Sequence, residues 1–163
     1  METARPPQGQ GGSGDTYAVG VDPTRLESLR RALAEDQTID IVTRGARTGE
    51  RRTTEIWFTR VGDDIFICGT PAGDGTPAPR RPRDWLANLS AHPELEFVLK
   101  ESVQATLPAV ATVITDQEER TRIFSAPETA YYREQTGSLD RLVDEAPLVR
   151  VTFTGDASAL NTA

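Results

Sequence analysis

Hydrophobic residues in the first part of the chain change their spacing in a way that predicts one helix followed by three strands. Over residues 23–35, leucines recur every three or four positions behind Pro23, a pattern typical of an amphipathic helix. Residues 38–43, 55–61 and 65–68 are short segments in which apolar residues alternate with polar ones or run together, which indicates strands. Because turns join these segments directly, the pattern predicts an antiparallel meander.

The rest of the chain mixes helical and strand periods. Helices are predicted at residues 83–91, 117–125 and 127–135, and strands at residues 95–99, 103–115 and 148–154. Asp116 and Glu119 fit the capped start of a helix, and Pro108 indicates an edge position or a bulge in its strand. About six mostly antiparallel strands with flanking helices, without βαβ alternation, predict an α+β fold whose sheet closes into a small barrel.

The ends of the chain and one internal segment do not follow these periods. Residues 1–20 are rich in Gly, Pro and Gln, so we expect a disordered N-terminal tail. Residues 21–155 are expected to form a single domain, followed by a short C-terminal tail over residues 156–163. Residues 69–79 hold three glycines and three prolines, which can neither continue a strand nor form a helix interior. Long loops of this kind in compact domains are functional or disordered.

Charge and cysteine content exclude several classes of protein. The chain of 163 residues has a formal net charge of −7 at pH 7, which argues against a nucleic-acid partner. One cysteine and one histidine provide neither a disulfide nor a zinc cluster, so we expect no metal. Neither a signal peptide nor a membrane span is visible, and we expect a cytoplasmic protein. Seven of the 18 basic residues fall within residues 44–52 and 80–83, a local patch that suits a small anionic ligand.

The turn before residue 55 contains the parts of a phosphate site. Arginine offers a planar fork of donors, threonine adds hydroxyl donors, and glycine allows backbone N–H groups to approach an anion. The candidates are Arg47, Thr48, Gly49, Arg51, Arg52, Thr53 and Thr54. The alternative is a solvated hairpin tip in a proteome that prefers arginine, since Lys100 is the only lysine.

Three motifs in order resemble the deazaflavin-dependent nitroreductase family of the flavin-binding split β-barrels. They are Gly45-x-x-x-Gly49-x-x-Arg52-x-Thr54, the Gly-Thr-Pro-x-Gly loop from Gly69, and the segment from Asp84 to Pro93 that reads Asp-Trp-Leu-Ala-Asn-Leu-Ser-Ala-His-Pro. The match is strong over residues 39–100 and weak as far as residue 153. The resemblance implies a split β-barrel that binds reduced coenzyme F-420, with the arginine turn on the phosphate side. It places the loop of Gly69, Thr70, Pro71, Ala72 and Gly73 against the ring.

Four aromatic residues are candidates for contacts with ring or substrate. Trp85 is assigned to the cofactor, with core packing as the alternative, and the neighbouring Asn88 is expected to bind backbone amides. The resemblance places Tyr131 and Tyr132 in the substrate pocket, where a hydroxyl can donate a proton or a hydrogen bond as hydride arrives. The alternative for both is a cap on the core. Trp57 either contacts substrate or covers the barrel.

The chain departs from the family pattern in two places. Glu55-Ile56 stands where proline and leucine are commoner, and the carboxylate there can repel an anionic cofactor, point outward or take part in proton transfer. Residues 74–81 look like an insertion, either a lid or a variable surface loop.

We therefore expect a hydride transfer from reduced coenzyme F-420 to a small electron-poor acceptor such as a quinone, an enone or a nitro compound. The cofactor carries the chemistry, so the absence of an acid-base dyad does not count against this reading. The alternatives are an FMN-dependent oxidoreductase on the same barrel, or a non-catalytic flavin- or deazaflavin-binding protein. A homodimer is an expectation from the resemblance alone.

Overall fold

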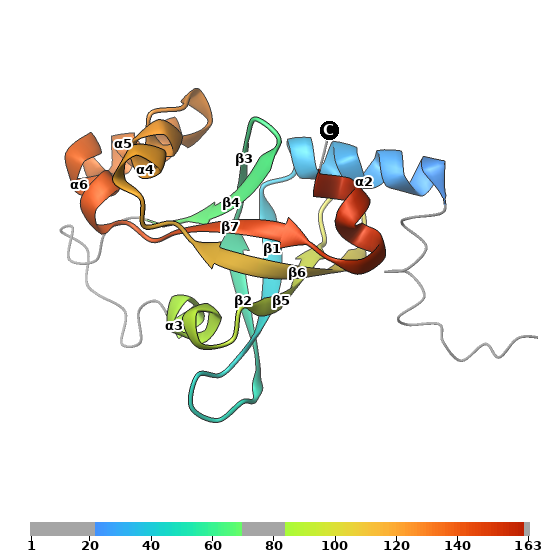
Figure 1. The fold of residues 1–163 in the computed structure, drawn as a ribbon. Helices are drawn as coiled ribbons and strands as arrows, with labels where there is room; N and C mark the ends of the chain where they lie inside the picture. The colour runs from blue at the N-terminus through green and yellow to red at the C-terminus, as the bar shows by residue number, and fades with distance from the viewer. Residues whose placement is uncertain (1–21, 70–83, 162–163) are drawn as a thin grey trace, which may run out of the picture.

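The computed structural model describes residues 22–69 and 84–161, and in this part of the chain it contains one antiparallel sheet (Figure 1). The sheet has seven strands in the order β2-β1-β5-β6-β7-β4-β3. Their bounds are β1 Thr38–Arg44, β2 Arg51–Trp57, β3 Thr59–Val61, β4 Asp64–Cys68, β5 Glu94–Leu99, β6 Ala105–Val113 and β7 Leu148–Phe153. The predicted N-terminal tail, the loop residues Thr70 to Gly73 and the insertion at 74–81 lie outside the described residues.

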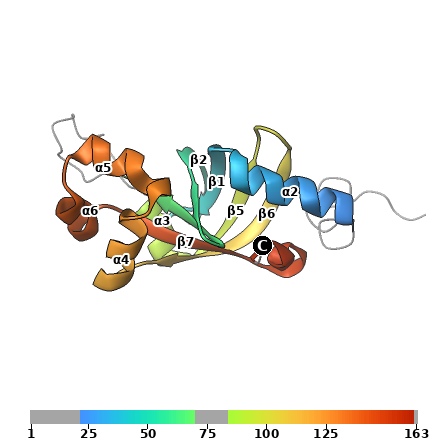
Figure 2. The same ribbon diagram turned by 90° about the horizontal axis from the view of Figure 1, so that it is seen from above.

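The order of the strands shows how the sheet curls. Its two end strands, β2 and β3, are consecutive in the chain and are separated only by Phe58. One nearly continuous extended segment therefore forms both ends of the sheet, which brings these ends together, and the curl is visible in Figure 2. Closure of this kind leaves little exposed sheet edge. The predicted α+β split-barrel fold is confirmed.

The predicted three-strand meander is wrong, because the segment at 51–61 changes its partner. Its first half, β2, pairs with β1, whereas its second half, β3, pairs with β4. Strand β4 pairs with β7 on its other side. The change occurs at Phe58, whose N–H donates to the Gln37 carbonyl over 3.0 Å while its ring is buried in the core. Periodicity predicts the strand but not its partner, because pairing is set by distant residues.

Pro108 lies in the interior of the sheet and not at its edge. Strand β6 is paired on both sides, with Pro108 opposite Glu96 of β5. The Pro108 carbonyl accepts from the N–H of Thr154, one residue beyond the end of β7. In an antiparallel strand the N–H and C=O of one residue point to the same side, so the missing donor faces the place where β7 ends.

Helices flank both ends of this sheet. Their bounds are α2 Pro23–Glu35, α3 Asp84–Ala91, α4 Gln117–Phe124, α5 Ala130–Thr136 and α6 Leu139–Glu145, with 3-10 turns η2 Pro127–Thr129 and η3 Gly155–Asn161. Helix α2 begins as predicted, with Pro23 in its first turn and the Asp22 carboxylate accepting from two backbone N–H groups. Asp116 caps α4 by accepting from the Glu119 N–H over 2.9 Å. Helix α6 was not predicted.

The apolar side chains form two cores. The larger lies inside the curled sheet and under α2, where Phe97 makes edge-to-face contacts with Phe58 and Phe153 at 5.3 Å between ring centroids. The smaller lies between strands β4 and β7 and helices α4 to α6, and includes Phe66 and Phe124.

The C-terminal residues belong to the larger core. The sequence assigns residues 156–163 to a short tail, but Gly155–Asn161 forms η3, in which the side chains of Ala157 and Leu160 are buried. The Asn161 side-chain amide accepts from the Phe153 N–H over 2.8 Å and donates to the Phe153 carbonyl over 2.9 Å. This amide completes backbone hydrogen bonding at the end of β7 and holds η3 against the sheet.

Candidate functional site

The arginine turn, residues 45–50 between β1 and β2, has a defined backbone. The Gly45 N–H donates to the Glu50 carbonyl over 2.7 Å, and the Gly49 N–H donates to the Gly45 carbonyl over 2.9 Å. Gly49 has a φ of 75°, which side chains rarely adopt. At Gly45 a Cβ atom would lie 2.8 Å from the Thr48 hydroxyl, so a side chain there would displace that hydroxyl. The backbone angle at Gly49 and the close Thr48 hydroxyl at Gly45 explain why glycine suits both positions of the motif.

Arg51 and Arg52 point to opposite faces of β2. Arg51 makes two hydrogen bonds to the Glu96 carboxylate, at 3.0 and 3.2 Å, and this contact raises the pKa of the guanidinium. Thr53 is on the same face as Arg51, since side chains alternate along a strand. Arg52 lies across Gly45 on the other face, with Thr54, and its ion pair with Glu50 is long at 3.8 Å.

The crest of the turn, residues 46–48, carries hydrogen-bond donors that can bind an anion. The backbone N–H groups of Arg47 and Thr48, like the Arg47 guanidinium, have no hydrogen-bond partner within the described part of the chain. The Thr48 hydroxyl accepts from the Glu50 N–H over 3.1 Å, and its own hydrogen is free to donate. Together with Arg52, these groups match the oxygens of a phosphate. Arg47, Thr48 and Gly49 thus lie in the turn itself and Arg52 at its base, whereas Arg51 and Thr53 are on the opposite face of β2.

Asn88 of α3 holds this turn in place. Its Oδ1 accepts from the Ala46 N–H over 2.9 Å, and its Nδ2 donates to the Thr43 hydroxyl over 3.2 Å. Figure 1 shows α3 beside the turn at the lower end of the sheet. The prediction that Asn88 binds a backbone amide is confirmed. Thr43 was not singled out from the sequence, because an alternating strand gives no sign that one of its buried positions is polar.

Gly69 follows β4, a strand that runs in the same direction as β1, the strand that leads into the arginine turn. Four antiparallel pairings lead from β1 through β5, β6 and β7 to β4. Because each pairing reverses the direction, β1 and β4 run the same way. The Gly69 N–H donates to the Pro147 carbonyl over 3.2 Å. Thr70, Pro71, Ala72 and Gly73 lie outside the described residues.

The aromatic candidates are divided between surface and core. Trp57 and Tyr131 are 37% and 47% exposed, and their rings are 5.2 Å apart. Tyr132 is buried in the smaller core, and burial raises the pKa of its hydroxyl, which stays protonated. Trp85 is buried in the larger core beside Leu89. Trp57 ends the strand that Arg51 begins, about 20 Å away at 3.3 Å per residue, so the exposed pair does not touch the arginine turn.

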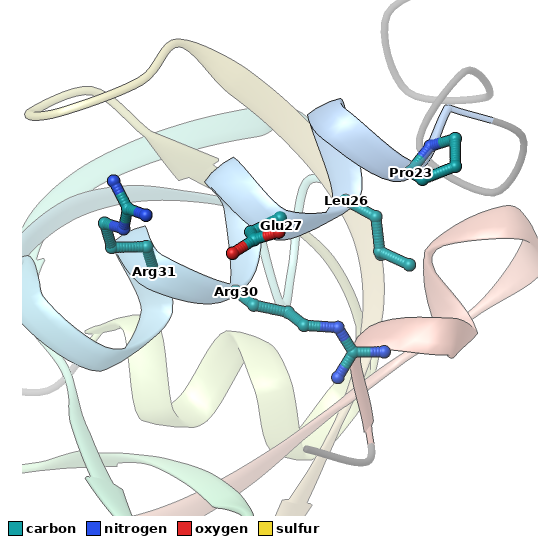
Figure 3. A pocket seen from close by; sticks show the side chains of 5 residues that line it. All are labelled: Pro23, Leu26, Glu27, Arg30 and Arg31. Atoms are coloured by element: carbon teal, nitrogen blue, oxygen red, sulfur yellow. The ribbon is translucent and has the colours of Figure 1, made fainter.

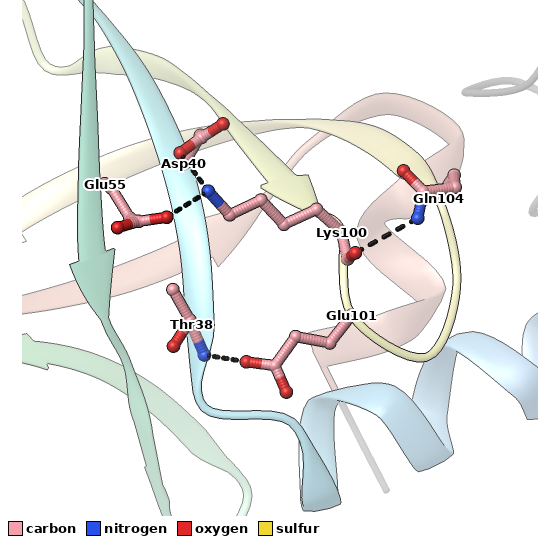
Figure 4. A network of polar contacts seen from close by, with 6 residues as sticks. All are labelled: Thr38, Asp40, Glu55, Lys100, Glu101 and Gln104. Atoms are coloured by element: carbon pink, nitrogen blue, oxygen red, sulfur yellow. Dashed lines mark hydrogen bonds and ion pairs between the residues drawn. The ribbon is translucent and has the colours of Figure 1, made fainter.

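Glu55 points outward and shares the only lysine with Asp40. The Lys100 ammonium donates to Asp40 over 2.7 Å and to Glu55 over 2.6 Å, as Figure 4 shows. These hydrogen bonds, that to Asp40 first, raise the pKa of Lys100. Residues 40 and 55 are paired across β1 and β2 and share the outer face with Arg51. The carboxylate that departs from the family pattern at Glu55 is therefore held by Lys100 on the outer face, and it does not face the arginine turn.

Arg120 is a buried cation whose role was missed in the sequence. It is 8% exposed, and its guanidinium donates to the carbonyls of Val143, Ile114, Leu142 and Ala146. Three of these carbonyls lie at the end of α6, so the side chain caps that helix and ties α4 to it. Burial lowers the pKa of Arg120. An arginine among polar helix residues gives no sequence signal of such a role.

Among the hollows of the described residues are three that lie away from the arginine turn. One of about 500 Å³ lies along α2, where Figure 3 shows Leu26 and Arg30 pointing towards η3 and Arg31 pointing away. A second, of about 430 Å³, lies between α3, the end of β6 and α6, with Leu86, Val113 and Leu148 in its wall. A small one of about 120 Å³ adjoins Asn161. The hydrogen-bond donors of the arginine turn, and not a cavity, are the basis for assigning an anion site there.

Two further searches of the described residues bear on partners. No helix there has the length and apolar character needed to cross a membrane. No group of three or more His, Cys, Asp or Glu side chains is arranged to hold a metal ion. Cys68 is buried, as predicted, and burial raises the pKa of its thiol to about 12.

Comparison with known proteins gives a family match over most of the chain. Residues 28–152 match the family described as F420H(2)-dependent quinone reductase. A protein of that name from Mycobacterium tuberculosis (strain ATCC 25618 / H37Rv) is 40% identical over 55 residues, 34% of either chain. The chain thus spans about a third (34%) of the length of the curated relatives it matches.

Solved structures are similar in fold. A conserved hypothetical protein from Mycobacterium tuberculosis superposes with a TM-score of 0.56 at 15% identity, covering 79% of this chain and 80% of that one. An FAD-binding protein from Mesorhizobium loti gives a TM-score of 0.53 at 11% identity, covering 80% and 89%. At these identities the likeness extends to the fold alone.

Proposed function

Because the chain belongs to the F420H(2)-dependent quinone reductase family, we propose that it is an oxidoreductase that passes a hydride from reduced coenzyme F-420 to a quinone. The observation that carries this proposal is the arginine turn, where the backbone N–H groups of Arg47 and Thr48 have no partner among the described residues and the Arg52 guanidinium has only a long contact with Glu50. Coenzyme F-420 presents a phosphate and an acidic tail, and these are the groups that such a turn binds.

The residues of this chain are proposed to bind and orient. Arg47, Arg52 and the backbone of Thr48 hold the phosphate, while Gly49 permits the backbone turn that directs these donors outward. The loop from Gly69 to Gly73 is assigned to the ring. When bound, reduced F-420 supplies the hydride, so the protein need add only orientation, exclusion of water and a proton donor.

The acceptor side of the reaction is assigned to the exposed aromatic pair. Reduction of a quinone to a hydroquinone requires a proton with the hydride, and the Tyr131 hydroxyl or water can donate it. Trp57 beside it offers a flat apolar surface for a ring. Tyr132 is buried and is assigned to support of Tyr131, at 5.5 Å between ring centroids. Enones and nitro compounds, which are also electron-poor, are proposed as further acceptors.

Parallel fluorescence titrations of the purified protein with F-420 and FMN test the cofactor. We expect F-420 to bind and FMN to bind much more weakly. Preference for FMN would favour the FMN-dependent alternative on the same barrel. A chain that binds neither would contradict the proposed function.

Oxidation of reduced F-420 by a soluble benzoquinone, followed by absorbance, then tests the reaction. We expect turnover that depends on both protein and quinone. Binding of F-420 without turnover of quinone, enone or nitro acceptors would identify a non-catalytic binding protein. Light scattering after size-exclusion chromatography tests the homodimer, which is part of the proposal together with a cytoplasmic location.

A further inference from the structure

The contact between α3 and the arginine turn has features of a positioning device. Asn88 is only 7% exposed, and the Thr43 hydroxyl that it contacts is buried as well. Both ends of the Asn88 amide are used, since Oδ1 accepts from the Ala46 N–H and Nδ2 donates to Thr43. An amide with partners of opposite kind at its two ends has one orientation only. Asn88 therefore fixes the first peptide of the crest against the helix.

This anchoring decides which donors of the turn are free. The Ala46 N–H is occupied by Asn88, whereas the next two N–H groups, of Arg47 and Thr48, have no partner among the described residues. The turn is otherwise closed by two backbone hydrogen bonds that involve Gly45. Without Asn88 the Ala46 N–H would lose its partner, and the crest could rotate relative to Arg52.

We propose that Asn88 is the positioning residue of the anion site: it sets the direction of the Arg47 and Thr48 N–H groups without touching the ligand. The inference rests on the proposed function, because it concerns the same phosphate site, but it assigns a role that acts through Ala46. Thr43 shares the role, since it fixes the other end of the Asn88 amide.

Ligand pairs that differ only in the anion test this assignment. The variant Asn88→Ala is titrated with F-420 and with the corresponding deazaflavin riboside, which lacks the phosphate and the acidic tail. We expect affinity for F-420 to fall about tenfold, the effect of one lost hydrogen bond on a positioned anion site, with no change for the riboside. Equal losses for both ligands, or no loss for F-420, would overturn the proposal.

Variants at Thr43 provide a matched control. Thr43→Ser keeps the hydroxyl that Asn88 contacts, whereas Thr43→Val keeps the shape and removes it. We expect Thr43→Ser to bind F-420 as the unchanged protein does and Thr43→Val to bind it more weakly. Equal F-420 affinity of these two variants would count against the proposal. If Asn88→Ala fails to fold, this pair decides.

A second measurement does not depend on the cofactor. Inorganic phosphate is titrated into labelled protein, and the amide NMR signals of Arg47 and Thr48 are followed. We expect both signals to shift in the unchanged protein. In Asn88→Ala we expect a higher phosphate concentration to be needed for the same shift. Failure of F-420 to bind, with this phosphate response intact, would reject the proposed function and leave the role of Asn88 standing. If the Arg47 and Thr48 amides do not respond to phosphate in the unchanged protein, the proposed role of Asn88 is overturned.

Discussion

Arg51 and Arg52 are adjacent in the sequence and have different environments in the structure. Arg51 is held by two hydrogen bonds to Glu96 on the outer face of β2. Arg52 crosses Gly45 at the base of the turn and has only a long contact with Glu50. Since neighbouring side chains on a strand alternate between faces, only one of the two can serve the anion site.

Replacing each arginine in turn tests this division. We expect Arg52→Ala to weaken F-420 binding by about 1.5 to 3 kcal/mol, the contribution of a charge-assisted hydrogen bond. Arg51→Ala, the matched control, removes the same charge from the same strand and is expected to change the affinity little. Dissociation constants from fluorescence titration provide the measurement. A larger loss for Arg51→Ala than for Arg52→Ala would assign the site to the other face.

How far single residues could be predicted depended on whether their partners were local. The two glycines of the turn follow from turn geometry, which residues close in sequence determine. The partners of Glu55 and Arg51 are Lys100 and Glu96, more than 40 positions away, and no local pattern indicates them. Core packing of Trp85 was the alternative to a cofactor contact, and the structure shows its side chain buried in the larger core.

At the scale of the elements, the helices and strands were predicted more accurately than their neighbours in space. Helix α2 and strands β1, β5 and β7 have the expected positions within two residues. The meander was wrong because Phe58 divides one periodic segment between two partners. The predicted edge position of Pro108 was wrong. Its missing N–H donor faces the place where β7 ends, and the sequence of β6 alone does not indicate where its neighbour ends.

The helical cap α4 to α6 depends on one buried cation. We expect Arg120→Met, which keeps an apolar stem but leaves several carbonyls without donors, to lower the free energy of unfolding by about 3 kcal/mol. Arg122→Met is the matched control on the same helix, because Arg122 is exposed and contacts only Glu119, at 3.4 Å. Its effect should be below about 0.5 kcal/mol. Urea denaturation measures both, and equal effects would remove Arg120 from this role.

At the scale of the whole molecule, the smaller core contains two acids that are protonated in the folded state. Burial raises the pKa of Cys68 from its ordinary value of 9.0 to about 12 and also raises that of Tyr132. Above pH 9 the unfolded chain releases the thiol proton while the folded protein retains it. Their contribution to stability is therefore complete below this pH and is lost as the pH rises towards the folded values.

The free energy of unfolding, measured as a function of pH above pH 9, tests the contribution of the buried thiol. Between pH 9 and pH 10.5, Cys68 contributes a fall of about 1.4 kcal/mol per pH unit once the unfolded thiol is ionised. We expect Cys68→Ala to reduce the fall by this amount, whatever its effect at neutral pH. Denaturation at several pH values provides the slopes, and parallel curves for the two proteins would show that the thiol does not take part.

The Asn88 hydrogen bonds join α3 to the arginine turn, and β4, which ends before Gly69, runs in the same direction as β1. Under the proposed function, the turn holds the anionic part of one elongated ligand. The composition of the chain, acidic overall with a basic turn, agrees with a small ligand of this kind. Under the proposed function, which follows from the family match over residues 28–152, this ligand is coenzyme F-420.

Phosphorus NMR of bound F-420 observes the phosphate itself and so tests whether the arginine turn holds it. We expect the phosphorus signal to shift on binding to the unchanged protein, and Arg52→Ala to abolish most of this shift while ring fluorescence still reports binding at higher protein concentration. A phosphorus signal that stays at its free position while the ring is bound would show that the turn does not hold the phosphate.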